Sequence, residues 1–122
     1  MLKFVEMDEN VTLNDQMQQG GRPVILINKF TVNPEEVDQL RRAWEADAAY
    51  FKKQPGFIST QLHRGIGGSC VFVNYAVWES AEQFRSAFNN PEFHERLKAY
   101  PPSAVVSPHL FEKVAVPGIC TA

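Results

Sequence analysis

Two residues of one apolar stretch, Asn74 and Trp78, place an amide four residues from an indole, and the amide could hydrogen-bond a ligand. Successive side chains of a strand point to opposite faces, so residues 71–78 (VFVNYAVW) would place both on one side together with Phe72. An amide in an apolar row costs free energy unless it is hydrogen-bonded, and its partner can be backbone, water or a ligand. The stretch therefore predicts a strand with a candidate binding site on one face.

Asn28 repeats this pattern in a second stretch rich in β-branched residues, 24–32 (VILINKFTV), where it shares a face with Leu26 and Phe30. Either asparagine alone could instead have a structural role, with its side chain bonded to neighbouring backbone. Two amides in adjacent apolar rows favour a role in a site over a purely structural one.

Two histidines are candidates for contact with such a ligand. His94 follows Phe93 in a predicted helix that would cover the site, and imidazole titrates near neutral pH, as a general base requires. A solvent-exposed helical histidine is an equally weighted interpretation of His94. His63 lies near the end of a predicted strand, residues 57–63, and is assigned as a substrate contact.

Composition narrows the function classes. The chain of 122 residues has the length of one domain, with 44% hydrophobic and 21% charged residues. Its formal net charge of -2 gives no basic surface for nucleic acid. The two cysteines, Cys70 and Cys120, form neither a disulfide framework nor metal-ligand spacing. No apolar run approaches the roughly 20 residues that span a bilayer, and the start lacks a secretory signal, so we predict a cytoplasmic protein.

Glycine and proline residues that interrupt regular structure divide the chain into an arm, a domain and a tail. Residues 1–23 are polar and Gln-rich and end in Gly-Gly-Arg-Pro, which indicates an arm that either docks on a partner subunit or frays. Residues 24–116 carry the periodic segments of the domain, and residues 117–122 form a short tail. The domain reads as strand, helix, strand, strand, helix, strand, with the last strand placed at about 109–116.

The first predicted helix starts after Asn33-Pro34, ends before Gln54-Pro55-Gly56 and carries an apolar stripe. The members of the stripe recur at helical spacing: Val37, Leu40, Trp44, Ala48 and Phe51. We therefore assign Trp44 to the core. The second helix is capped by Ser80 and buries Phe84, Ala87 and Phe88, and Asn90-Pro91 starts the segment that holds His94.

This order of elements predicts an α+β, ferredoxin-like fold, in which helices cover one face of an antiparallel four-stranded sheet. The other face of the sheet would be bare and apolar, which is unusual for a monomer. A second copy packed sheet against sheet would cover it, so we predict a homodimer. The residues assigned to that face are Val71, Val73, Tyr75, Val77, Ile58 and Leu62.

The frame of residues 24–56, the Pro-Gly-Phe turn at 55–57 and above all VNYAVWES at 73–80 resemble the antibiotic biosynthesis monooxygenase family. The resemblance covers about residues 24–116 and implies a dimeric α+β barrel. The family includes cofactor-free oxygenases that act on anthrones and hydroquinones, quinol monooxygenases, haem-degrading enzymes and members of no known activity. The closest motif match is to the cofactor-free polyketide oxygenases.

The resemblance assigns roles residue by residue. In the cofactor-free oxygenases, an asparagine and a tryptophan of this strand contact substrate, and these positions are Asn74 and Trp78. The same enzymes use a tyrosine at the position of Phe84 and an arginine at or near His94, so this chain departs there. The haem-degrading enzymes share Asn28, but their tryptophan and histidine positions hold the residues Ala87 and Leu97.

The resemblance implies a monooxygenase that joins a small aromatic substrate to dioxygen without a metal, flavin or other cofactor. His94 or a water would take the substrate proton, while Asn74 and Asn28 would donate to the developing oxyanion. An aromatic wall would hold the ring away from water, formed by Phe72, Trp78, Phe84 and Phe88. The alternatives are a non-catalytic binding protein with the same barrel and, with less support, a haem-degrading monooxygenase.

Overall fold

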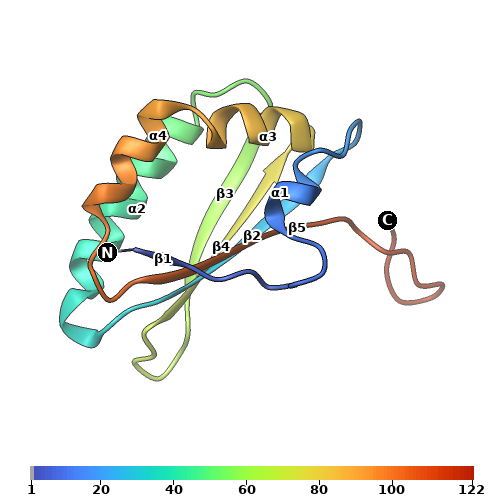
Figure 1. Ribbon diagram of the computed structural model, residues 1–122. Coiled ribbons are helices and arrows are strands. Elements are labelled where there is room, and N and C mark those ends of the chain that lie inside the picture. The colour runs from blue at the N-terminus through green and yellow to red at the C-terminus, as the bar shows by residue number, and fades with distance from the viewer. Residues whose placement is uncertain (1) are drawn as a thin grey trace.

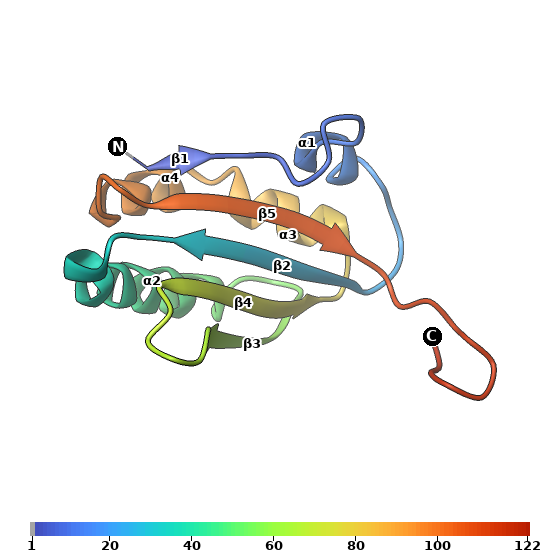
Figure 2. The same cartoon turned by 90° about the horizontal axis from the view of Figure 1, so that it is seen from below.

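A five-stranded sheet runs through the computed structural model, which describes residues 2–122, and helices cover one face of the sheet (Figure 1). Among the strands of residues 2–122, β1 pairs in parallel with β5, and the other pairs are antiparallel. Figure 2 shows the strands in their spatial order, which is β1 (Lys3–Phe4), β5 (Val105–Phe111), β2 (Val24–Thr31), β4 (Val71–Trp78) and β3 (Phe57–Arg64). The last four have the predicted ferredoxin-like order. The arm adds a fifth strand that was not predicted, and the sheet stays open.

The helices lie where the capping signals put them. After a 3-10 turn at Pro34–Glu36, α2 runs over Val37–Phe51 behind the sheet. Ser80 Oγ accepts a hydrogen bond from Gln83 N (3.2 Å) and caps α3 (Ala81–Phe88). Asn90 in the same way caps α4 (Pro91–Arg96), which a 3-10 turn at Leu97–Ala99 extends. None of the helices within residues 2–122 is long and apolar enough to cross a membrane.

The buried stripe of α2 differs from the predicted one after its first two residues. Val37 and Leu40 are buried as expected. Further along, the buried positions are Ala43, Asp47 and Tyr50, whereas Trp44, Ala48 and Phe51 are half-buried. The stripe therefore passes through an acid, and the residues assigned to the core lie beside it.

A bulge in β3 corrects the predicted face of one residue. Phe57 lies opposite Trp78, but Ser59 lies opposite the next residue of β4, so Ile58 is the extra residue and is exposed. The bulge lets Phe57 and Leu62 point to the same face, toward the helices. Leu62 packs there near the buried core, so its assignment to the bare face was wrong.

The alternation predicted for β4 is confirmed. Phe72, Ala76 and Trp78 are buried against the helices, and Tyr75 on the opposite face is 39% exposed. Its neighbours on that face form an apolar surface that no helix or strand within residues 2–122 covers, comprising Ile25, Val71, Val73, Val77 and Phe111. We refer to this surface as the outer sheet face.

The last strand begins and ends earlier than predicted. β5 covers Val105–Phe111, and residues 112–122 are exposed and project away from the sheet (Figure 1). Pro108 obscured this strand in the sequence, because proline interrupts a ladder. In the structure, the Pro108 nitrogen points away from β2, toward the edge of β5 that β1 pairs with only at its start. Leu110 N points to the same edge and donates a hydrogen bond to the Gln16 side chain (2.9 Å).

The arm docks on its own chain. β1 joins the edge of β5 through Lys3 N to Ala104 O (3.0 Å) and Val5 N to Val106 O (2.9 Å). Further along, α1 (Leu13–Gln16) starts at a capping box and buries Leu13 and Met17 against the core. The arm is thus an ordered edge of the sheet.

Candidate active site

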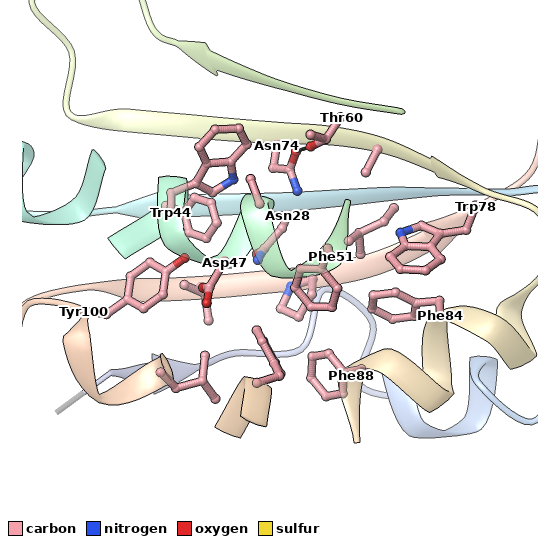
Figure 3. A pocket seen from close by; sticks show the side chains of 18 of the residues that line it. Asn28, Trp44, Asp47, Phe51, Thr60, Asn74, Trp78, Phe84, Phe88 and Tyr100 are labelled. Carbon is pink, nitrogen blue, oxygen red and sulfur yellow. Dashed lines mark hydrogen bonds between the residues drawn. The ribbon is translucent and has the colours of Figure 1, made fainter. Parts of the chain in front are cut away.

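A cavity lies between the helix-facing side of the sheet and α2, α3 and α4 (Figure 3). Its walls are mainly aromatic and aliphatic, and its few polar side chains come from both layers. The polar residues that line it are Asn28, Asp47, Thr60, Asn74 and Tyr100, with the indole of Trp44 beside them. An apolar chamber with a few converging polar groups is the usual form of a small-molecule site.

The Asn28 side chain is oriented by the backbone. Its Oδ1 accepts a hydrogen bond from Ser107 N (3.1 Å) in the neighbouring strand β5. Because a backbone N–H can only donate, the amide oxygen faces it and the NH₂ group is the free end at the cavity. Asn28 therefore presents donors to whatever occupies the cavity.

Asn74 is arranged in the same way from β4. The Thr60 hydroxyl of β3 donates to Asn74 Oδ1, and Asn74 lies directly opposite Asn28 in the β2–β4 register. Within residues 2–122, neither amide nitrogen has a hydrogen-bond partner. The predicted pair of donors is therefore side by side on the floor of one cavity.

Trp78 closes one end of the cavity (Figure 3). It is only 1% exposed and makes edge contacts with Phe51, Phe57 and Phe84, with ring centroids 5.6–5.8 Å apart. Phe88 lines the cavity next to Phe84, at 5.4 Å. The structure thus brings three of the predicted ring contacts, Trp78, Phe84 and Phe88, to the cavity.

Three other predicted site residues do not line the cavity. Phe72 is buried in the core cluster around Leu40. His63 lies opposite Val73 in the register, so it points to the outer sheet face, where its Nδ1 is 3.2 Å from Val73 O. His94 is exposed on α4 and touches the edge of Phe88. The expected placement of these three at the cavity is corrected. For His94 the reason is that α4 turns Phe93 inward and leaves His94 in solvent.

Asp47 is a site residue that the sequence analysis missed. It is 5% exposed, lines the cavity from α2, and shares a hydrogen bond with the Tyr100 side chain. Burial raises the pKa of Asp47 from 3.8 to about 6, against the lowering effects of the Tyr100 hydrogen bond and the Arg96 charge. The available signal was its spacing, three residues after Trp44 and four before Phe51, which places an acid on an apolar stripe.

The arm contributes to the wall as well. Leu2 and Phe4 line the cavity, and the Phe4 ring meets Phe88 edge to face at 6.5 Å. Phe4 lies in β1, which pairs with the edge of β5, and Leu2 directly precedes β1, so the arm extends the apolar wall of the cavity along that edge.

Known proteins share this architecture. The family model described as antibiotic biosynthesis monooxygenase matches residues 23–99. The chain belongs to this family. The amide pair, Trp78 and the aromatic wall all lie within the matched segment, whereas the arm precedes it.

A sequence match and a structural match both come from Streptomyces nogalater. A deoxynogalonate monooxygenase is 36% identical over 72 residues, which cover 57% of this chain and 58% of that relative's length. The crystal structure of SnoaB, a cofactor-independent oxygenase, superposes with a TM-score of 0.67 at 28% identity and covers 80% of this chain and 99% of that one. A protein of unknown function from Bacteroides thetaiotaomicron shares the fold, at 18% identity, a TM-score of 0.68, and coverage of 75% and 98%.

The residues at the haem-binding positions do not fit that cofactor. Leu97 stands at the histidine position, and it presents a hydrocarbon side chain to the cavity. Ala87 is buried under Tyr50, whose hydroxyl donates to the Ala87 carbonyl (2.9 Å). The side chains at these positions thus offer no ligand for haem iron.

Proposed function

We propose that this protein is a cofactor-independent monooxygenase that oxidises a flat, electron-rich aromatic substrate, such as an anthrone or hydroquinone, with dioxygen. The observation that carries the proposal is the paired amides of Asn28 and Asn74, whose oxygens are engaged and whose NH₂ groups face an apolar cavity. The names of the S. nogalater relatives support the same reaction class.

In the proposed reaction, a substrate such as an anthrone loses a proton and becomes an electron-rich anion. The amide donors stabilise the negative charge on its oxygen, and the aromatic walls exclude water from it. The anion gives one electron to dioxygen, and the two radicals combine to form a carbon–oxygen bond. The peroxide takes up a proton, and loss of water then leaves a carbonyl, so that one oxygen atom enters the product and the other becomes water.

A second candidate function is binding without chemistry. Phe84 supports it, because a buried phenyl ring stands where the resemblance places the tyrosine of the oxygenases. Oxygen uptake by metal-free protein with a panel of anthrones, hydroquinones and catechols separates the two, with haem titration run beside it. Uptake with formation of the oxygenated product supports the oxygenase. Saturable binding without uptake supports the binding protein, and haem breakdown would contradict both.

Trp44 and Trp78 are expected to respond differently to truncation. Trp78→Ala should cost about 3–5 kcal/mol of stability, because the ring is fully buried among three aromatic partners. Trp44→Ala should cost less stability but weaken substrate binding, since this half-buried indole lies beside Asn74 in the cavity. Thermal melting and ligand titration on both variants check the contrast. Unchanged affinity in folded Trp44→Ala would return this indole to a purely structural role.

The outer sheet face leads us to propose a homodimer. Tyr75, Val71 and Phe111 are each more than one-third exposed, and a face of this kind is usually covered in solution. Sedimentation at micromolar concentration is expected to give twice the mass of the chain. Val73→Asp should shift the protein toward monomer, whereas the surface change Lys53→Asp, remote from that face, should not. A stable wild-type monomer would contradict the proposal.

A further inference from the structure

One carboxyl group lines the cavity within residues 2–122, and the reaction outlined above gives it no role. Among the cavity-lining residues in 2–122, Asp47 is the sole charged side chain. It comes from α2, in the helical layer, whereas both amides come from the sheet. Figure 3 shows the two amides and the carboxylate around one cavity, so a ligand that entered it would meet donors from one layer and a carboxylate from the other.

The Asp47 carboxylate interacts with one neighbouring side chain, but one of its oxygens lacks a hydrogen-bond partner within residues 2–122. Tyr100 shares a hydrogen bond with it, while the buried Oδ1 has no partner within residues 2–122. The positive charge that acts on it, Arg96, forms an ion pair with Glu92 (3.2 Å) and lies over the Tyr50 ring at 5.7 Å. A buried carboxylate with a purely structural role would have both oxygens bonded, because an unmet charge-bearing atom is costly.

We infer that Asp47 removes the substrate proton and that Tyr100 positions its carboxylate for that step. The inference rests on the proposed oxygenase function and adds the proton acceptor to it. It replaces the predicted acceptor His94, which lies outside the cavity.

The transfer is simple to balance for an anthrone probe. The bond between the ring methylene carbon and hydrogen breaks, and its electron pair moves into the ring and onto the carbonyl oxygen. The amide donors of Asn28 and Asn74 hold that oxygen, and the proton bonds to the Asp47 carboxylate. The protonated carboxyl group then returns the proton to the peroxide after dioxygen has added, so the carboxylate is regenerated in each turnover.

The acid–base properties of the surroundings suit this role. A carboxyl group with a pKa raised to about 6 is ionised at neutral pH yet is a stronger base than an ordinary aspartate. Tyr100 and Arg96 are the groups that act on its titration. Burial and the Asp47 charge raise the pKa of Tyr100 above that of a free phenol. Tyr100 therefore stays protonated and can donate to Asp47.

Anaerobic mixing isolates the proton transfer from the oxygen chemistry. The probe is anthrone, and the signal is the absorbance of the anthrolate anion that forms in the cavity. For wild type, the rate of anthrolate formation should rise with pH as Asp47 ionises near pH 6, and we call this rise the limb of the pH–rate curve. Asp47→Asn should lower the rate at least about a hundredfold and abolish the limb, the range expected for loss of a general base. Asp38→Asn, an exposed change on the same helix, should leave rate and limb intact.

Tyr100→Phe gives an independent readout of positioning. Its hydrogen bond lowers the pKa of Asp47, so its removal should move the limb to higher pH, a shift that loss of packing would not produce. This variant also carries the test if Asp47→Asn does not fold. An unchanged wild-type limb in either folded variant, or no anthrolate with wild type, overturns the inference.

The two proposals can fail separately. Anthrolate formation that depends on Asp47, without oxygen uptake in air, would overturn the oxygenase function and leave the proton acceptor standing. Oxygen uptake by Asp47→Asn with the wild-type rate and pH dependence would overturn Asp47 as the proton acceptor and leave the oxygenase function standing.

Discussion

Asn74→Ala is expected to lower turnover by about a hundredfold or more while substrate affinity barely changes. The Asn74 NH₂ group faces the cavity, and its oxygen is already engaged by Thr60. A donor to a neutral ground-state oxygen adds little to binding, but the same donor to an oxyanion stabilises the transition state by about 3–4 kcal/mol. The measurement is the oxygen-uptake rate over a range of substrate concentrations, which separates kcat from KM.

A structural asparagine would behave differently. Its removal would leave the Thr60 hydroxyl without its acceptor and cost about 1–3 kcal/mol of stability, with turnover per folded molecule intact. Thr60→Val is the matched control, because it removes the hydrogen bond that orients the amide but keeps the NH₂ group. We expect it to lower turnover less than Asn74→Ala does. A folded, fully active Asn74→Ala would rule out the oxyanion role.

Local sequence signals were sufficient for the frame and for half of the site. The period of two in β4 placed Asn74 and Trp78 on one face, and caps such as Ser80 placed the helices. These features depend on residues near one another in the chain. The register that sets Asn74 opposite Asn28 follows once both strands face the same helices.

The remaining features depended on contacts between distant segments. Asp47 looked like an ordinary surface acid until α2 turned it toward Tyr100, more than 50 residues later. His94 and Phe93 are adjacent, and only the packing of α4 decides which of them points inward. The bulge at Ile58 reversed the alternation in β3, and no residue type in that stretch signals it. Strand β1 forms by pairing in parallel with the edge of β5, and the sequence of the arm does not indicate this partner.

Asp47→Asn is expected to stabilise the protein at neutral pH although it removes the proposed proton acceptor. The folded chain binds a proton at Asp47 up to about pH 6, whereas an unfolded chain releases it near 3.8. Between these values the folded state holds more protons, so the free energy of unfolding falls as pH rises through this window. At roughly 1.4 kcal/mol per pKa unit, the buried charge costs the wild type about 3 kcal/mol above pH 6.

Urea denaturation at pH 4 and pH 7.5 measures this difference. Asparagine keeps the shape of the side chain and an acceptor for Tyr100 but cannot ionise, so the variant should match wild type near pH 4 and exceed it by up to about 3 kcal/mol at pH 7.5. Asp38→Asn, on the exposed side of the same helix, should show no such dependence on pH. An Asp47→Asn variant less stable than wild type at pH 7.5 would mean that the carboxylate holds the fold together. Greater stability with lost proton transfer would mean that the charge is kept in the cavity for chemistry, at the expense of stability.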